Sequence, residues 1–171
     1  MRKVLLVILT VALIAVLVLI TRIKNASSIN EWQVDPFKTD MEMSRATLIT
    51  FFDRLSEKRY TEATKYSGFG YDILEEWNPN VEKTDHALLM KYGCEINGLQ
   101  CLKIRKVLTQ QQVSPAEFEF TVQFTNDDGS LFERGPCCGA DNEEPIQTDF
   151  TYIVKKIGDN FLVLTSPVHI S

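Results

Sequence analysis

The feature that most constrains this chain is an apolar run near its N-terminus. Residues 4–20 are seventeen in number, and Thr10 is the only polar one among them. Basic residues flank the run on both sides: Arg2, Lys3, Arg22 and Lys24. As a helix the run is roughly 25 Å long, close to the ~30 Å hydrocarbon core of a bilayer, and basic side chains at its ends can reach the interface.

Three structures compete for this segment: an uncleaved signal anchor, a cleaved signal peptide and a buried core helix. The apolar region of a signal peptide usually has about 7–15 residues and ends at a small-x-small site. Here the run is longer, and residues 26–28 (Ala-Ser-Ser) are the only tolerable site. A core helix would carry one polar face, which this run lacks. We therefore expect residues 1–24 to be a transmembrane anchor, with a cleaved signal peptide as the alternative.

The rest of the chain has a different character. Without residues 1–24 it holds 14 basic and 23 acidic residues, a net charge of −9. About 140 residues is a common size for a single domain with its own core. An acidic domain of this kind is not expected to bind nucleic acid or to dock on anionic lipid, because both need clustered Lys and Arg.

All four cysteines follow the apolar run: Cys94, Cys101, Cys137 and Cys138. An even number in the part that an anchor would export fits two disulfides in an oxidising, extracytoplasmic compartment. A bond between the adjacent Cys137 and Cys138 would need a strained ring, so we expect two bridges that tie the 94–101 segment to the 137–138 loop. Reactive thiols and a metal site are the alternatives, but the spacing is not that of a redox pair or a zinc site.

Helical signals fill the first half of the exported part. Residues 25–38 are polar, contain Pro36 and indicate a short linker before a domain at residues 39–171. Thr39 and Glu42 have the spacing of a capping box, which begins an amphipathic helix ending near Lys58. Shorter helices are expected at residues 60–66, 71–77 and 84–92, the last ended by Gly93.

After residue 94 the period of the hydrophobic residues changes to alternation. Strands are expected at residues 102–113, 117–124, 130–134, 148–157 and 161–165, joined in part by turns at 126–129 and 158–160. The second strand places four apolar residues on one face: Phe118, Phe120, Val122 and Phe124. Helices first and about five antiparallel strands afterwards indicate an α+β fold in which this face packs on the helices.

Three stretches, in this order, resemble the nuclear transport factor 2-like (cystatin-like, SnoaL-like) superfamily. Residues 51–63 resemble its long first helix and the start of its second, and residues 116–126 resemble a central strand. Residues 152–163, followed by Pro167, resemble its closing hairpin. The resemblance covers residues 40–168 and implies a cone-shaped fold with a pocket between the helices and a curved sheet. It also implies varied uses: small-molecule enzymes such as ketosteroid isomerases, dimers formed through the sheet, and membrane-anchored extracytoplasmic domains.

Candidates for lining such a pocket are aromatic: Tyr60, Tyr66, Trp77, Phe118, Phe120 and Tyr152. Such side chains suit a binding cleft, but they suit an ordinary core better. The catalytic residues of the isomerases do not map onto this sequence, and no catalytic, cofactor or metal motif is found in it. We expect a membrane-anchored extracytoplasmic domain that binds a protein partner or a small apolar ligand. The alternative is an isomerase or dehydratase that uses a buried carboxylate and a Tyr.

Overall fold

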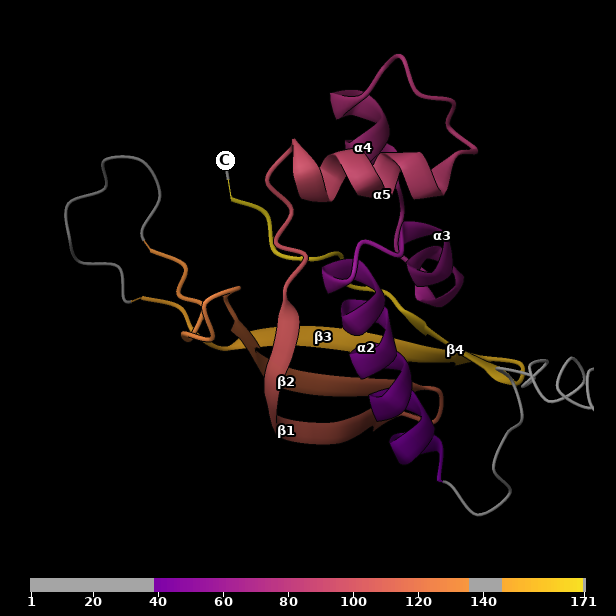
Figure 1. Ribbon diagram of the computed structural model, residues 1–171. Coiled ribbons are helices and arrows are strands. Elements are labelled where there is room, and N and C mark those ends of the chain that lie inside the picture. Colours follow the sequence, from indigo (N-terminus) through magenta and orange to yellow (C-terminus); the bar gives the residue numbers. More distant parts are fainter. Residues whose placement is uncertain (1–38, 136–145, 171) are drawn as a thin grey trace, which may run out of the picture. The chain divides into compact units, whose positions relative to one another are not determined.

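The computed structural model describes residues 39–135 and 146–170, which form an α+β domain (Figure 1). The helical elements are α2 (Asp40–Ser56), α3 (Tyr60–Ala63), the 3₁₀ helix η1 (Thr64–Tyr66), α4 (Asp72–Trp77) and α5 (His86–Glu95). The strands are β1 (Lys103–Ser114), β2 (Glu117–Thr125), β3 (Phe150–Ile157) and β4 (Asn160–Val163). The predicted anchor and linker, residues 1–38, and the cysteines at 137 and 138 lie outside the described residues. No helix within those residues has the length and apolar character to cross a membrane.

The start of α2 confirms the predicted capping box. The Thr39 hydroxyl accepts a hydrogen bond from the backbone N–H of Glu42 at 3.3 Å, and the Thr39 N–H donates to Oε2 of Glu42 at 2.8 Å. Both bonds satisfy groups that have no partner within the helix, and so they fix where α2 begins.

The end of α2 is a Schellman motif with an unusual residue in it. The N–H of Lys58 donates to the carbonyl of Leu55 at 3.0 Å, and the N–H of Arg59 donates to the carbonyl of Arg54 at 2.8 Å. These two bonds define the motif, whose left-handed position normally holds glycine. Here that position is Lys58, with φ of 59°.

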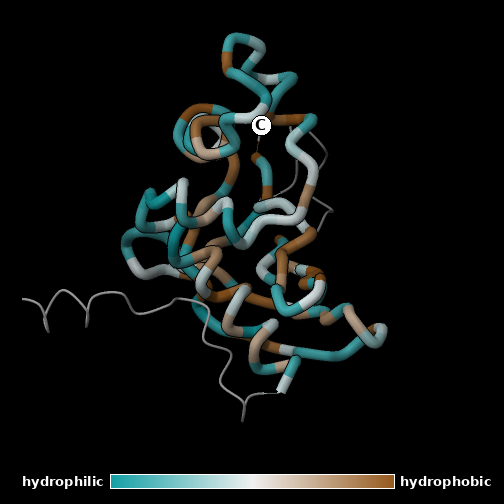
Figure 2. The backbone as a smooth tube through the Cα atoms, turned by 90° about the vertical axis from the view of Figure 1, so that its right-hand side faces the viewer, coloured by the Kyte–Doolittle hydropathy of each residue, from teal (hydrophilic) through white to brown (hydrophobic). Residues whose placement is uncertain are grey.

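The strands form one antiparallel sheet in the order β1-β2-β3-β4. Along β2 buried residues alternate with half-buried ones, and the four buried residues are those predicted for its apolar face. Figure 2 shows hydrophobic and hydrophilic residues interspersed along the backbone of the domain. Their neighbours on β3 continue the face, since Phe118 pairs with Val154 and Phe120 with Tyr152.

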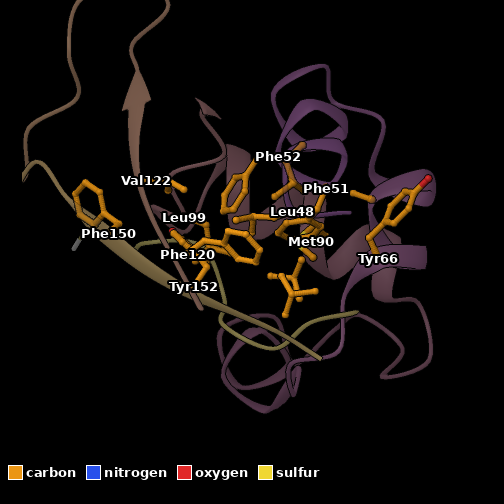
Figure 3. Close-up of a cluster of buried hydrophobic side chains, with 14 of the residues drawn as sticks. Leu48, Phe51, Phe52, Tyr66, Met90, Leu99, Phe120, Val122, Phe150 and Tyr152 are labelled. Atoms are coloured by element: carbon orange, nitrogen blue, oxygen red, sulfur yellow. The ribbon is translucent and has the colours of Figure 1, made fainter. Parts of the chain in front are cut away.

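The core lies between this face and α2, as expected (Figure 3). The ring of Phe52 lies 4.8 Å from that of Phe124 and 4.9 Å from that of Tyr152, measured between centroids. The ring of Phe51 lies 5.0 Å from that of Phe52 and 6.0 Å from that of Phe69, which joins the sheet layer to the segment between the shorter helices. These contacts make α2 the central element of the domain.

The prediction for α5 was wrong at its end. The helix begins after Asp85, whose carboxylate accepts from the N–H of Leu88 at 3.0 Å, and it continues past Gly93 to Glu95. Gly93 lies buried inside the helix, where an added Cβ would be 2.7 Å from Cδ1 of Leu99. The glycine is therefore required by close packing rather than by a helix end.

The predicted strand at residues 130–134 was also wrong. The turn at Gly129 returns the chain far enough for the N–H of Phe132 to donate to the carbonyl of Phe124 at 3.1 Å. Beyond that, residues 130–134 make only isolated bridges, one between Leu131 and Thr125 at the end of β2 and one between Arg134 and Gln147. The described residues therefore hold a four-stranded sheet rather than about five strands.

Candidate functional site

The six aromatic residues predicted to line a pocket lie in different places. Phe118, Phe120 and Tyr152 are buried between the sheet and α2, and Tyr66 is also buried in the core. Trp77 is partly buried, and its ring lies 4.5 Å from that of His169. Tyr60 borders two clefts in the described part of the chain.

The interior between helices and sheet is apolar. Within residues 39–135 and 146–170, Ser44 is the only fully buried residue with a polar side chain apart from tyrosine, and its hydroxyl donates to the carbonyl of Met41 at 2.9 Å. The hydroxyl of Tyr152 is buried without a hydrogen bond of ordinary geometry to any described residue. Burial raises the pKa of Tyr152 well above its ordinary value, and a weak contact with the Val168 backbone opposes that rise only in part.

A cleft of about 570 Å³ opens between the end of α2, the start of α3 and the loop that joins α5 to β1. This volume is within the range of sites for small molecules, roughly 300–1,000 Å³. Its apolar lining includes Leu55, Leu99 and Leu102, together with a disulfide. Its charged lining groups are Lys58, Glu95 and Asp127. We call it the disulfide cleft.

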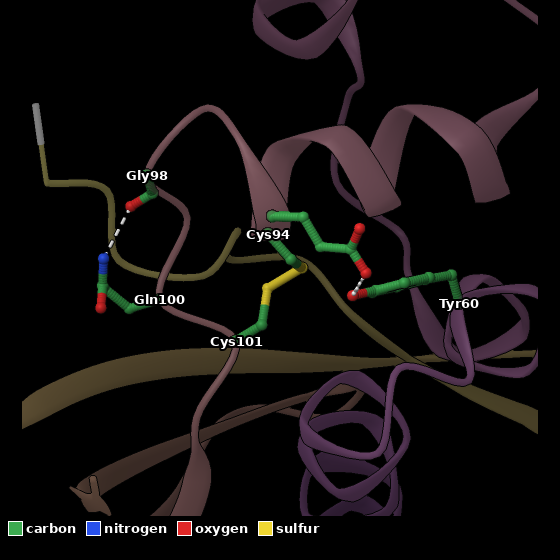
Figure 4. Close-up of a disulfide and its surroundings, with 6 residues drawn as sticks. Tyr60, Cys94, Gly98, Gln100 and Cys101 are labelled. Atoms are coloured by element: carbon green, nitrogen blue, oxygen red, sulfur yellow. Dashed lines mark hydrogen bonds between the residues drawn. A yellow bond between two sulfur atoms is a disulfide. The ribbon is translucent and has the colours of Figure 1, made fainter. Parts of the chain in front are cut away.

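The disulfide joins Cys94 to Cys101 (Figure 4), seven positions apart, with a Cα–Cα distance of 5.6 Å. The predicted bridges from these cysteines to the 137–138 loop are therefore wrong. The reason is local: Gly98, with φ of 83°, turns the chain back between the end of α5 and the start of β1. The turn brings the two Cα atoms within the 4.4–6.8 Å that a disulfide needs. The Asn-Gly pair midway between the cysteines was the signal for this pairing.

The C-terminal segment holds this loop in place. The N–H of Ile170 donates to the carbonyl of Gly98 at 3.0 Å, and the N–H of Gln100 donates to the carbonyl of Val168 at 2.7 Å. An added Cβ at Gly98 would lie 2.1 Å from the carbonyl oxygen of Ile170, so the approach requires glycine. The loop wall of the cleft is thus fixed by a disulfide on one side and by backbone pairing on the other.

Tyr60 and Glu95 meet across the cleft. The hydroxyl of Tyr60 donates to Oε1 of Glu95 at 3.1 Å (Figure 4). Burial, together with this carboxylate, raises the pKa of Tyr60 to about 12, so the phenol keeps its proton at neutral pH. The pair joins α3 to the last residue of α5, two segments that are distant in sequence. Glu95 was missed from the sequence because an exposed carboxylate near a helix end carries no signal of its own.

A smaller cleft of about 400 Å³ lies on the other side of Tyr60 and shares Lys58 with the first. Its charges are largely engaged within the protein. Arg59 pairs with Glu62, and Asp85 caps α5. The disulfide cleft is therefore the better candidate for a ligand site.

Among the described residues, no group of three or more His, Cys, Asp or Glu side chains is placed to hold a metal ion. In comparisons with known proteins, no family model matches the sequence and no curated protein matches it.

Proposed function

We propose that this chain is a membrane-anchored, extracytoplasmic binding domain whose ligand occupies the disulfide cleft. The observation that carries the proposal is the cleft itself, a space of about 570 Å³ whose loop wall is closed by the Cys94–Cys101 bond. Disulfides persist in oxidising compartments, which supports an extracytoplasmic location. The apolar run at residues 4–20 supports the anchor.

The lining of the cleft indicates the class of ligand. Glu95 and Asp127 supply carboxylates for an ammonium group, and Lys58 supplies an ammonium for a carboxylate. The leucines and the disulfide supply apolar surface between these charges. A small zwitterion with an apolar side chain, such as an apolar amino acid, fits this lining better than a purely apolar molecule.

Calorimetric titration of the full chain in detergent micelles with three related probes tests this. L-phenylalanine carries both charges, 2-phenylethylamine only the amine and 3-phenylpropionate only the carboxylate. L-phenylalanine should bind most tightly. Glu95→Gln should weaken the binding of L-phenylalanine and of 2-phenylethylamine by about tenfold or more, because a charge-assisted hydrogen bond is lost. The affinity for 3-phenylpropionate should not change.

The matched control is Glu76→Gln, which removes the same charge from an exposed position on α4 outside the cleft lining. Equal binding of L-phenylalanine by both variants and the parent chain would place the ligand elsewhere. Equal affinity for all three probes would contradict recognition by charge.

A second candidate function is a small-molecule enzyme of the isomerase or dehydratase kind. The hydrogen bond between Tyr60 and Glu95 favours it, since a phenol beside a carboxylate can move a proton to or from a bound substrate. Time-resolved NMR of each probe with the full chain separates the two functions. Conversion that Tyr60→Phe abolishes would favour the enzyme, and binding without conversion favours the binding domain.

For the fold, we propose the cone of the nuclear transport factor 2-like superfamily. The packing of a long α2 on the aromatic face of the sheet supports it, with the short helices gathered beyond the end of α2 (Figure 1). A homodimer through the outer face of the sheet stays a prediction of the resemblance. Sedimentation velocity of the full chain in detergent, at several concentrations, tests it.

A further inference from the structure

One end of the sheet carries two exposed hairpin tips side by side. The β1–β2 hairpin turns at residues 113–116 and the β3–β4 hairpin at residues 157–160. A backbone hydrogen bond of 2.7 Å from the N–H of Lys156 to the carbonyl of Ala116 joins them. We call these two segments the hairpin edge.

The hairpin edge exposes apolar side chains. Val113 is 47% exposed and Ile157 is 51% exposed, and Pro115 between the two strands of its hairpin is also exposed. Isolated exposed aliphatic residues are ordinary, but these lie at one end of the sheet on adjoining turns. The question is what surface they face.

The described chain begins at the same end of the domain. Nζ of Lys156 lies 2.8 Å from both carboxylate oxygens of Asp40, in the first turn of α2. Figure 1 shows both hairpins turning on the side of the sheet where α2 begins. The first described residues of the chain, Thr39 and Asp40, therefore lie beside the hairpin edge.

We propose that the hairpin edge rests on the membrane that the N-terminal segment enters, with Val113 and Ile157 in the lipid interface. The proposal rests on the membrane anchor of the proposed function. Even fully extended, the 14 residues 25–38 reach no more than roughly 50 Å, so a tether of this length holds the domain at an effective concentration of the order of millimolar near the membrane. Under such tethering a few aliphatic side chains are enough for a persistent contact.

The charges of the edge indicate which lipid it meets. Lys155 pairs with Glu117 at 2.8 Å, and Lys156 pairs with Asp40. Asp159, which is exposed in the β3–β4 turn, adds a negative charge. The edge therefore has no excess of positive charge to attract anionic lipid, and the contact is with the interface of zwitterionic lipid.

This orientation has a consequence for the disulfide cleft. The cleft is formed at the end of α2 and before the start of β1, whereas the hairpin edge lies at the start of α2 and the end of β1. A domain resting on its hairpin edge turns the cleft away from the bilayer, toward ligands in the aqueous phase.

Tryptophan quenching by brominated lipid tests the contact. The full chain is reconstituted into phosphatidylcholine vesicles whose acyl chains carry bromine, with Ile157→Trp as the probe and Ile73→Trp as its control. Ile73 is 60% exposed on α4, so the two substitutions match in residue type and exposure. After subtraction of the parent spectrum, which contains Trp32 and Trp77, the tryptophan at 157 should be quenched and blue-shifted and the one at 73 should be neither. Val113→Trp is the second probe and should behave like Ile157→Trp.

The outcomes separate the two proposals. A chain that does not float with the vesicles overturns the anchor and with it the proposed function. A chain that floats, but whose tryptophans at 157 and 113 are quenched no more than the one at 73, overturns the hairpin edge and leaves the anchor intact. Quenching that requires added phosphatidylserine overturns the assignment to zwitterionic lipid. Unchanged thermal unfolding of each variant shows that its fold is retained.

Discussion

Replacing Lys58 by glycine should stabilise the domain, because Lys58 holds the left-handed position of the Schellman motif that ends α2. For a residue with a Cβ this left-handed conformation is less favourable than the right-handed one by roughly 1–2 kcal/mol. Glycine avoids that strain but loses about 0.5–1 kcal/mol through its greater freedom in the unfolded chain. The net expectation is a gain of about 0.5–1 kcal/mol, which for a domain of this size raises the midpoint of thermal unfolding by roughly 2–4 °C.

The assay is thermal and urea unfolding of the full chain in detergent micelles, followed by circular dichroism. Lys58→Ala is the control, since it removes the same ammonium group but keeps the Cβ and therefore the strain. Only the glycine variant should gain stability. If both variants gain equally, the effect comes from charge and not from the backbone. If the glycine variant is less stable than the parent chain, the conformational reasoning is refuted.

Four further predictions concern the cysteines and the tyrosines. Replacing Cys94 and Cys101 together by alanine should lower the free energy of unfolding in urea by about 2.5 kcal/mol, the value expected for a closed loop of eight residues. A loss of about 4 kcal/mol would instead indicate bridges that close loops of about 40 residues. Folding raises the pKa of Tyr60 from 10.0 to about 12, so its contribution to stability is complete below pH 10 and is lost as the pH rises through 12. In Tyr60→Phe the free energy of unfolding should fall less between pH 10 and pH 12 than in the parent chain. An equal fall in both would contradict the raised pKa of Tyr60. Tyr152→Phe should leave stability unchanged or raise it by up to about 1 kcal/mol because its buried hydroxyl makes only a weak contact with the Val168 backbone and no hydrogen bond of ordinary geometry to a described residue. Tyr71→Phe should cost about 1 kcal/mol in the same unfolding assay because its hydroxyl lies 2.6 Å from that of Ser67, and the reverse order would refute both assignments.

The elements that could be predicted from the sequence are those whose signals lie within a few residues of each other. The capping box of Thr39 and Glu42 placed the start of α2 correctly. Alternation from Phe118 to Phe124 identified both β2 and its buried face. In each case the local pattern and the tertiary packing favour the same structure, so the local pattern was sufficient.

The wrong predictions concern residues whose role depends on packing and pairing that the local sequence pattern does not show. Glycine often marks the end of a helix, yet Gly93 lies inside α5, where Leu99 packs against it. Residues 130–134 have the composition of a strand, yet they make only isolated bridges, to Thr125 and to Gln147. Cys94 and Cys101 pair with each other because a local turn brings them together, although they were expected to reach a distant loop.

The candidate site was predicted only in part, through Tyr60. The disulfide cleft combines the end of α2, the loop after α5 and Asp127 in the turn after β2, and no sequence pattern links these segments. Lys58 and Glu95 were not singled out, because an exposed charged residue has no periodicity or spacing that marks it. The remaining aromatic candidates fill the core or, like Trp77, pack against the C-terminal segment.

The most direct test of the central claim is the thiol state of the chain in cell fractions. Membrane and soluble fractions are alkylated without reduction and digested with trypsin. Residues 92–103 form one tryptic peptide that contains both Cys94 and Cys101. A membrane-anchored, extracytoplasmic domain predicts this peptide in the membrane fraction, unalkylated and lacking both thiol hydrogens. The same peptide alkylated on both cysteines, or found in the soluble fraction, would contradict the account.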